Sequence, residues 1–247
     1  MKLIGIIPAR YGSTRFPGKP LAMIGDKTMI HRTYEQVLKS SLDAVVVATD
    51  DPRILAEVSG FGGRVVMTRS DHRSGTDRCR EAMDLLGGGY DAVVNIQGDE
   101  PFIDPVQIDQ VAALLRLDDV VLATLARKIT DPALLCNPNV VKVVFDAQGD
   151  ALYFSRHPIP FVRGTDPSLW VTKADYYQHI GLYGYKADTL RAVADLAPGR
   201  LEQAESLEQL RWLENGLRIR VGVTTSPNSF AIDTPQDLLN LPKSLLS

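Results

Sequence analysis

The sequence has only two cysteines, Cys79 and Cys136, among its 247 residues. They lie far apart and have no Cys or His neighbours at ligand spacing, which excludes a disulfide framework and a zinc site. The chain also lacks an apolar run of the ~18 residues that a membrane span needs. Its apolar start, Leu3 to Pro8, has no signal-peptide cleavage region. We therefore expect a cytoplasmic protein that is neither secreted nor inserted into a membrane.

An excess of basic residues is absent as well. The 27 Lys and Arg residues face 30 Asp and Glu residues, so the formal net charge is -3. This balance argues against nucleic acid as a partner. The sequence contains no internal repeat and no low-complexity tract, and 45% hydrophobic residues are typical of an ordinary soluble globular protein. Any cationic function must therefore be local.

The N-terminal half alternates short β-branched runs with helical patterns, which predicts parallel strands joined by crossover helices. The expected strands are Leu3 to Ile7, Ala44 to Thr49, Arg64 to Thr68, Ala92 to Ile96 and Val120 to Ala126. Three helical faces lie between or after them. The residues of these faces are Ile30, Tyr34, Val37 and Leu38; Cys79, Ala82, Met83 and Leu86; and Ile108, Val111, Ala112 and Leu115. We expect these helices to cover the sheet.

The pattern changes after residue 137. Two extended runs, Val140 to Phe145 and Ala151 to Phe154, flank a Gly-containing turn and predict an antiparallel hairpin. The stretch from His157 to Trp170 has no periodicity and predicts a long surface loop. The remaining expected elements are a strand at Gln178 to Tyr185, helices at Ala187 to Leu196 and Ala204 to Asn215, a strand at Arg218 to Val223, and a helix from Pro235. The fold class is α/β, with a mostly parallel central sheet and a small antiparallel lobe.

The loop after the first strand is rich in cations and glycines. It reads Pro8-Ala-Arg-Tyr-Gly-Ser-Thr-Arg-Phe-Pro-Gly-Lys-Pro-Leu21 and carries Arg10, Arg15 and Lys19. Ligands of open α/β sheets bind beyond the carboxyl ends of the strands, and Gly-rich backbone with Arg and Lys suits phosphate. The alternative is a basic surface loop. The spacing of its glycines matches neither the dinucleotide-binding motif nor the P-loop motif. We therefore expect the loop to bind a polyphosphate but assign it to neither of these two classes.

The fourth strand ends in Asn95-Ile-Gln-Gly-Asp-Glu-Pro101, which places Asp99 and Glu100 at the same edge of the sheet. Hard oxygen ligands there suit Mg2+ bound to phosphate. The alternative is that Asp99 and Glu100 cap a helix after Pro101. Asp233, followed by Thr234 and Pro235, is by itself best interpreted as a helix N-cap.

Other polar residues allow both a structural and a functional interpretation. Ser74 or Thr76 is suited to capping the next helix or to contacting a ligand. His179 lies on a predicted strand, where a lone His is usually structural. Arg156 is interpretable as a simple surface cation, and core packing is the default role of Tyr183.

Seven motifs in order resemble the 3-deoxy-manno-octulosonate cytidylyltransferases, the CMP-Kdo synthetases. These motifs cover essentially the whole chain. The first motif is shared with other nucleotidyltransferases. The Gln-Gly-Asp-Glu-Pro and Tyr-Phe-Ser-Arg segments are the ones that resemble this family in particular. The motifs are Ile7 to Leu21, Ser74 to Arg78, Asn95 to Phe102, Asn137 to Val144, Tyr153 to Arg156, His179 to Tyr185 and Leu207 to Arg211.

The resemblance implies a Rossmann-like nucleotide-diphospho-sugar transferase fold. It also implies the reaction of CTP with 3-deoxy-D-manno-octulosonate (Kdo) to CMP-Kdo and pyrophosphate, with Mg2+, for lipopolysaccharide biosynthesis. It implies that the protein is a homodimer. It also implies that residues 1–247 form a single cytidylyltransferase domain. Within it, residues 1–130 are the nucleotide-binding core, 137–185 the sugar-binding and dimerisation lobe, and 186–247 the return to the core.

The resemblance assigns the nucleotide side as follows. The triphosphate is held by Arg10, Ser13, Arg15 and Lys19, and Arg10 and Lys19 neutralise the pyrophosphate leaving group. The cytosine lies near Ser74 and Gly75, and Gln97 lies between nucleotide and sugar. The metal ligands are Asp99 and Asp233, although their spacing does not show that they meet, and one or two ions are both compatible with the sequence.

The sugar acid is assigned to Arg156, His179, Tyr183, Glu208 and Gln209. Its carboxylate needs a cation, which is Arg156 in a bidentate pair or, alternatively, a protonated His179. The segment between Pro158 and Asp175 matches no motif, so sugars such as 8-amino-Kdo or a sialic acid are alternatives.

Two further functions are alternatives. One is a regulatory module that binds a nucleotide without transfer chemistry. The presence of both Asp99 and Asp233 argues against this function. The other is a glycosyltransferase, which normally requires an Asp-x-Asp metal motif, whereas this chain has Asp99-Glu100.

Overall fold

The computed structural model describes residues 1–12, 16–227, 232 and 234–242. The chain forms two compact units, one made of residues 1–112 and 226–247 and the other of residues 113–225. Helix α4 (Pro105–Leu115) carries the chain from the first unit into the second. None of the helices in the described ranges has the length and apolar character needed to cross a bilayer.

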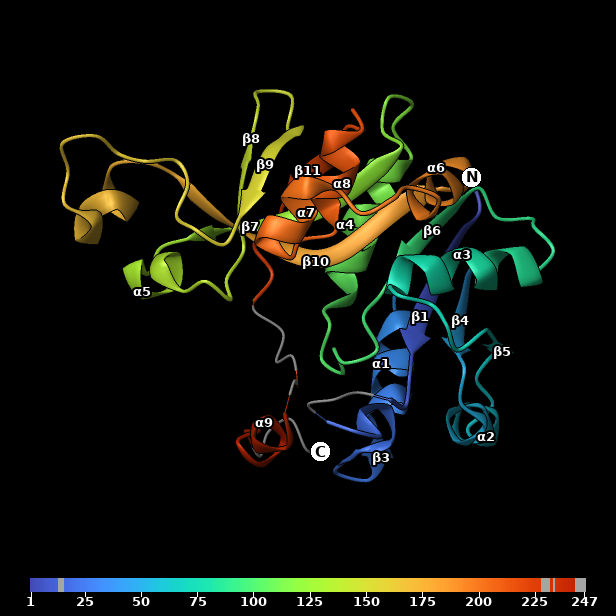
Figure 1. Cartoon of the computed structure of the whole chain (residues 1–247). Coiled ribbons are helices and arrows are strands. Elements are labelled where there is room, and N and C mark those ends of the chain that lie inside the picture. Colours follow the sequence, from blue (N-terminus) through green and yellow to red (C-terminus); the bar gives the residue numbers. More distant parts are fainter. Residues whose placement is uncertain (13–15, 228–231, 233, 243–247) are drawn as a thin grey trace. The chain divides into compact units, whose positions relative to one another are not determined.

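Unit 1 is built on four parallel strands, which confirms the predicted parallel core. Their order is β6, β1, β4, β5, and β1 pairs in parallel with β4 and with β6. Figure 1 shows β1, β4 and β5 side by side in blue. The strands are β1 (Leu3–Ala9), β4 (Ala44–Thr49), β5 (Val65–Met67) and β6 (Ala92–Asn95), and β2 (Met23–Ile24) and β3 (Lys27–Thr28) form a separate antiparallel pair.

The helices of unit 1 are η1 (Lys19–Leu21), α1 (Met29–Leu38), α2 (Pro52–Gly60), α3 (Gly75–Leu85) and α9 (Pro235–Leu239). Helices α1, α2 and α3 begin at polar N-caps and bury one apolar face, whereas η1 follows Gly18 and α9 has no buried residue. The predicted faces of the helices are largely confirmed, because Ile30, Val37 and Cys79 are fully buried. Leu38 is the exception: it is the last residue of α1, and 58% of its surface is exposed.

Unit 2 contains an antiparallel pair of long strands. β10 (Tyr176–Lys186) pairs antiparallel with β7 (Leu122–Ile129), and β11 (Arg220–Val223) pairs in parallel with β7. The predicted hairpin is confirmed, because β8 (Lys142–Phe145) pairs antiparallel with β9 (Ala151–Ser155). The helices are α5 (Pro132–Cys136), η2 (Pro167–Thr172), α6 (Ala187–Ala194), α7 (Arg200–Glu205) and α8 (Gln209–Glu214).

Two local predictions in unit 2 are wrong. The expected helix from Ala204 to Asn215 is split into α7 and α8, because Ser206 adopts a left-handed conformation with φ of 53°. Arg211 of α8 then binds the Glu202 carboxylate of α7 at 2.6 Å and 2.7 Å, which fixes the two helices together. The strand expected at residues 120–126 is predicted to pair in parallel with its neighbours. The structure instead pairs this strand, β7, antiparallel with β10.

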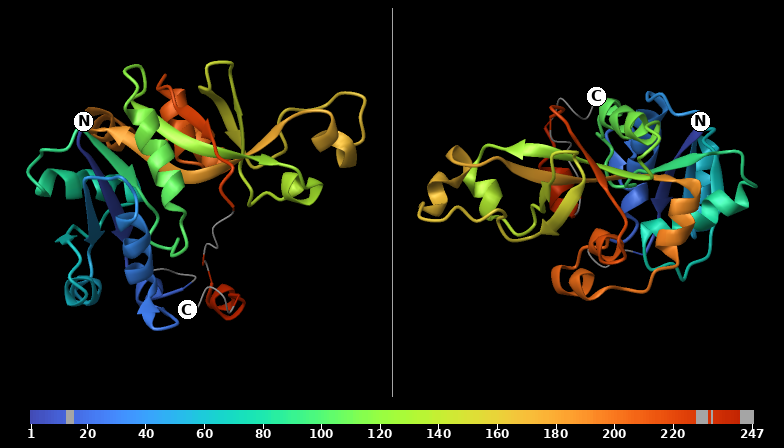
Figure 2. Two further views of the ribbon diagram at one scale, coloured as in Figure 1. Left: turned by 180° about the vertical axis from the view of Figure 1, so that it is seen from behind. Right: turned by 90° about the horizontal axis from the view of Figure 1, so that it is seen from above.

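The long loop after β9 is only partly as predicted. Figure 2 shows residues 157–172 extending beyond the ends of the strands of unit 2. The loop ends in η2, however, and Trp170 is 5% exposed, stacks on Tyr176 and donates through Nε1 to the Thr165 carbonyl at 2.9 Å. Burial of an indole with a satisfied N–H anchors the segment to unit 2.

The hairpin turn gives a prediction about stability. Gly149 has φ of 85°, a left-handed conformation that costs an L side chain roughly 1–2 kcal/mol. We expect Gly149→Ala to lower the free energy of unfolding by about that amount in urea denaturation. The control is Gly60→Ala at the end of α2, where an added Cβ meets nothing within 4 Å. Equal stability of Gly149→Ala and the wild type would contradict this account of the turn.

Candidate functional site

The site in unit 1 lies where the loops after β1 and β6 meet the N-terminus of α3. Gly18, with φ of 72°, donates to the Tyr11 carbonyl at 2.9 Å, so these two residues of the loop after β1 lie side by side. A Cβ at Gly98 would lie 3.0 Å from the Pro8 carbonyl oxygen, so only glycine lets these two loops approach so closely. The carboxyl ends of β1 and β6 are therefore in direct contact.

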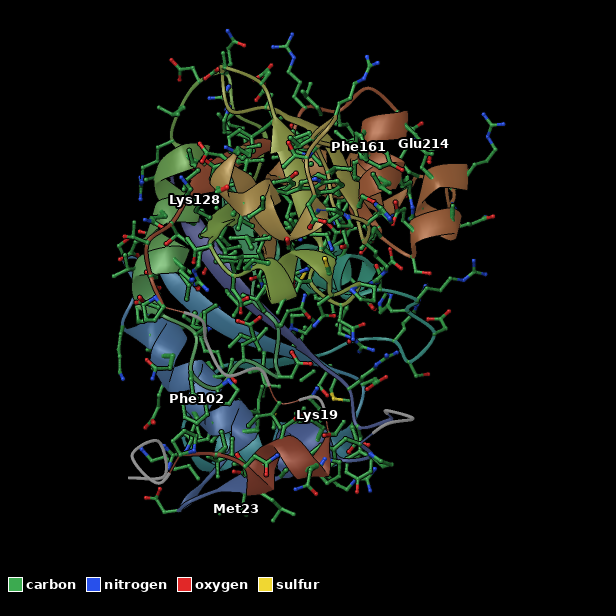
Figure 3. The ribbon with its side chains drawn as sticks, turned by 90° about the vertical axis from the view of Figure 1, so that its left-hand side faces the viewer. Lys19, Met23, Phe102, Lys128, Phe161 and Glu214 are labelled. Carbon is green, nitrogen blue, oxygen red and sulfur yellow. The ribbon has the colours of Figure 1, made fainter. Side chains whose placement is uncertain are left out.

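One ion pair joins the two loops. The Lys19 ammonium donates to Asp99 Oδ2 at 2.7 Å, and the side chains are 11% and 37% exposed, respectively. Lys19 is the first residue of η1, and Figure 3 labels its side chain. The exposed part of the Asp99 carboxylate is thus accessible to a ligand, while Lys19 is held in a fixed position.

A pocket opens between these loops. Four of its lining residues are Arg or Lys, and Asp99 is its acidic one. The lining residues are Pro8, Ala9, Arg10, Lys19, Pro20, His72, Arg73, Ser74, Gly75, Arg78, Gln97, Gly98 and Asp99. Such an excess of positive charge at a strand edge is suited to a polyphosphate.

Ser74 caps the next helix, as one of its two interpretations predicts, and it also lines the pocket. Its hydroxyl accepts from the Asp77 amide at 3.2 Å, and the Asp77 carboxylate accepts from the Ser74 amide at 3.2 Å, which makes a capping box at the start of α3. Ser74 also lines the pocket, together with Gly75. Thr76 is buried inside the helix and is not the cap.

The helix-cap alternatives for the acidic residues are wrong. No helix begins at Pro101; a turn follows, and α4 begins only at Pro105. The N-cap of α9 is Thr234, whose side chain accepts from the Asp237 amide, so it is not Asp233. Asp99 therefore lines the pocket and does not cap a helix.

Three predicted residues, Ser13, Arg15 and Asp233, lie outside the described residues. Next to Asp233 in sequence, Ile232 donates its backbone N–H to the Asp99 carbonyl at 3.3 Å. Ile232 is fully buried and packs with Ile24 and Met29. The chain thus returns to Asp99 immediately before position 233.

Sequence reasoning missed three residues of the pocket, namely His72, Arg73 and Arg78. Arg78 is 3% exposed, donates to Asp50 at 3.0 Å and to the Thr68 hydroxyl at 2.6 Å, and so joins the ends of β4 and β5 to α3. His72 is hydrogen-bonded to Glu81. Burial raises the pKa of Glu81, but its hydrogen bonds with His72 and with the Arg69 amide outweigh this and leave the pKa lowered.

The predicted sugar residues all lie in unit 2. His179 and Tyr183 of β10 have ring centroids 5.3 Å apart, and Tyr183 packs edge-on against Trp212. The Tyr183 hydroxyl is buried and has no hydrogen-bond partner among the described residues. Burial, and then the charge of Glu208, raise the pKa of Tyr183, so it stays protonated. Glu208 directly precedes Gln209, which is buried in α8.

Burial disfavours a charged His179, which argues against one of the two alternatives for the sugar carboxylate. Burial lowers its pKa to about 3, so the imidazole is charged only in strong acid. Its Nε2 lies 3.1 Å from the Thr124 hydroxyl. At neutral pH it offers hydrogen bonding without charge.

Arg156 lies at the end of β9 and is held by main-chain carbonyls. Its guanidinium donates to Glu205 O at 2.7 Å, Pro138 O at 3.1 Å and Ser206 O at 3.3 Å. A guanidinium has five N–H donors, so two remain without an acceptor in the described part of the chain. Arg156 can therefore still bind a carboxylate.

The unit 1 site has the features of an enzyme that binds a nucleotide through its phosphates, because cations converge at the carboxyl edge of a parallel sheet. The chain matches the family described as cytidylyltransferase over residues 4–219. It is 55% identical over 241 residues to the 3-deoxy-manno-octulosonate cytidylyltransferase of Bacteroides thetaiotaomicron, with 96% of each chain covered. The protein of that name from Pseudomonas fluorescens is 52% identical over 238 residues, covering 94% of each chain.

A solved structure of CMP:2-keto-3-deoxy-manno-octonic acid synthetase complexed with CTP has a TM-score of 0.89 at 43% identity. The matched region covers 97% of this chain and 96% of the solved chain. This chain belongs to the cytidylyltransferase family, whose members are nucleotidyltransferases. The resemblance to 3-deoxy-manno-octulosonate cytidylyltransferases is thereby confirmed, and so is the predicted fold class.

The pocket charge gives a binding prediction. Lys19→Gln removes a charge-assisted donor and leaves Asp99 unpaired, so binding of inorganic tripolyphosphate should weaken about tenfold or more in calorimetry. The control is Lys27→Gln, because Lys27 pairs with Glu35 at 2.7 Å and does not line the pocket. Equal tripolyphosphate affinities of the two variants would show that Lys19 is not a phosphate ligand.

Proposed function

We propose that this chain transfers the CMP group of CTP to the anomeric hydroxyl of Kdo and releases pyrophosphate. The observation that carries the proposal is the cationic pocket of unit 1. It occurs in a chain that is 55% identical to a 3-deoxy-manno-octulosonate cytidylyltransferase. The solved synthetase of similar fold is a complex with CTP, which supports CTP as the nucleotide.

The nucleotide side of the reaction follows from the pocket. The sugar hydroxyl attacks the α-phosphorus and gives up its proton to solvent. The bond between the α-phosphorus and the oxygen that bridges it to the β-phosphorus breaks, and pyrophosphate leaves with that oxygen. Catalysis of such transfers rests on positioning and on stabilising charge. Arg10 and Lys19 stabilise the negative charge of the leaving pyrophosphate, and Lys19 is held in position for this by Asp99. Ser74 and Gly75 are proposed to lie near the cytosine, and Gln97 between nucleotide and sugar.

Mg2+ fits the residues present. Among the described residues no group of three or more His, Cys, Asp or Glu could hold a metal, but Mg2+ commonly uses only one or two protein carboxylates beside substrate phosphates. The Asp99 carboxylate faces the pocket, and in the described ranges only its Oδ2 accepts a hydrogen bond. We propose Asp99 and Asp233 as its ligands. A bound Mg2+ supplies charge that polarises the phosphate oxygens.

The sugar side is proposed for unit 2. The two remaining N–H donors of Arg156 bind the sugar carboxylate, and neutral His179, Tyr183, Glu208 and Gln209 bind the sugar hydroxyls. The unpartnered, buried Tyr183 hydroxyl supports this, because such a group costs free energy unless a ligand satisfies it.

Location and assembly are part of the proposal. A cytoplasmic enzyme is supported by two free cysteines, of which Cys136 is exposed. We propose a homodimer that uses the lobe of residues 137–185, in which Leu152 and Phe161 are 62% and 72% exposed. The product is proposed to feed lipopolysaccharide biosynthesis.

The experiment that tests the function is pyrophosphate release with Mg2+, CTP or UTP, and a panel of free sugar acids. The panel contains Kdo, 8-amino-Kdo and N-acetylneuraminate. We expect release only when CTP and Kdo are both present. Equal turnover with UTP, or turnover with N-acetylneuraminate alone, would contradict the proposal, and CTP binding without turnover with any sugar would favour a regulatory module.

The metal assignment gives a separate prediction. Asp99→Asn keeps the size of the side chain but loses its charge, so Mg2+-dependent kcat should fall about 100-fold or more while the circular dichroism spectrum is unchanged. The matched control is Asp26→Asn, because Asp26 pairs with Arg32 and its side chain is 78% exposed. An unchanged kcat in Asp99→Asn would refute the assignment of Asp99 as a metal ligand.

A further inference from the structure

Lys142, the first residue of β8, is a fully buried cation that the proposed reaction does not use. Its exposed fraction is 0%. Its ammonium donates to three main-chain carbonyls, those of Asn137 at 3.0 Å, Val140 at 2.6 Å, and Arg156. An ammonium has three N–H donors, so all of them are used. Lys142 therefore ties the segment 137–140 to the end of β9.

Arg156 binds the same segment from the other side. While Lys142 holds the Arg156 carbonyl, the Arg156 guanidinium donates to Pro138 O, as well as to Glu205 O and Ser206 O. The Glu205 carboxylate accepts from the Ser155 hydroxyl at 2.7 Å and from the Arg156 amide at 2.9 Å. Lys142 and Arg156 are thus two cations of one hydrogen-bonded cluster.

The cluster has more positive than negative charge. In the part of unit 2 that the structure describes, neither Lys142 nor Arg156 has a carboxylate oxygen within 4.0 Å, and Glu205 is the carboxylate bonded into their network. Two cations and one anion leave a net charge of +1. An incoming carboxylate would neutralise it.

Stability alone does not account for a charge at this position. Burying an ammonium without a counter-ion costs free energy, and an apolar side chain of similar shape is often no less stable. Burial lowers the pKa of Lys142, Cys136 and Glu205 raise it, and Arg156 lowers it. A buried lysine with uncompensated charge beside a proposed substrate ligand points to a role in binding.

We propose that Lys142 is a positioning residue for the sugar acid: it fixes Arg156 and the segment 137–140, and its charge favours the sugar carboxylate. This inference rests on the proposed function, because it needs Arg156 to bind that carboxylate. Lys142 itself has no free donor and does not touch the substrate. Its removal should therefore affect sugar binding and leave the nucleotide alone.

The test compares Lys142→Met and Lys142→Gln with the wild type in steady-state kinetics. Met keeps the length of the side chain, and Gln keeps two N–H donors without charge. We expect both to raise the KM for Kdo about tenfold or more, with the KM for CTP changed less than about twofold. The control is Lys128→Met, because Lys128, which is labelled in Figure 3, is a 53% exposed lysine of the same unit. It pairs with Asp175.

A pH profile tests the charge without replacing Lys142. The lowered pKa means that Lys142 loses its proton before an ordinary lysine does as the pH rises. The KM for Kdo should therefore begin to rise at a lower pH than deprotonation of an ordinary lysine would allow, and Lys142→Met should lose this dependence. The profile is measured in a Cys136→Ser background, because Cys136 interacts electrostatically with Lys142.

The outcomes separate the inference from the proposed function. Pyrophosphate release with Kdo, together with an unchanged Kdo KM in Lys142→Gln or a flat wild-type profile, overturns the inference and leaves the function standing. Equal increases in the KM values for Kdo and CTP indicate a purely structural role and also overturn it. No turnover of the wild type with any sugar acid overturns both. If Lys142→Met does not fold, Lys142→Gln and the wild-type profile decide.

Discussion

The ion pair between Lys19 and Asp99 is the interaction on which the nucleotide site depends. It joins a loop that follows β1 to a turn that follows β6, 80 positions later. Parallel pairing of β1 with β6 brings these two ends together, and Gly98 allows the backbones to touch. The Asp99 carboxylate offsets the cost of burying the Lys19 ammonium, whose side chain is 11% exposed. It also holds Lys19 at the edge of the pocket.

Both units use the same electrostatic principle, although they hold different side chains. In unit 1, four Arg or Lys residues line a pocket with one acidic residue. In unit 2, Lys142 and Arg156 share a network with Glu205. In each case positive charges outnumber negative ones, and we propose that an anionic ligand neutralises the excess. CTP and a sugar acid are both anions, and such preorganised charge stabilises them without reorganisation during the reaction.

The sequence was sufficient to predict much of the fold and several residues that line the pocket of unit 1. Ala44 to Thr49 was predicted at the observed bounds of β4, because continuous β-branched runs bounded by polar residues have few other interpretations. Arg10, Lys19 and Asp99 were predicted because they lie in the segments that follow two strands, and the structure brings all three to one pocket. Arg78 was missed because its partner Asp50 lies 28 positions away, and such pairing is not visible in local patterns. The split between α7 and α8 was missed because Ser206 gives no signal for its left-handed conformation.

The central claim is that the anomeric oxygen of the sugar becomes bonded to the α-phosphorus of CTP. It is tested most directly with Kdo that carries a heavy oxygen isotope at its anomeric hydroxyl, followed by phosphorus NMR of the products. Our account predicts an isotope shift on the phosphodiester signal of CMP-Kdo and none on pyrophosphate. A label found in pyrophosphate or inorganic phosphate, or a nucleotide product without the label, would contradict it.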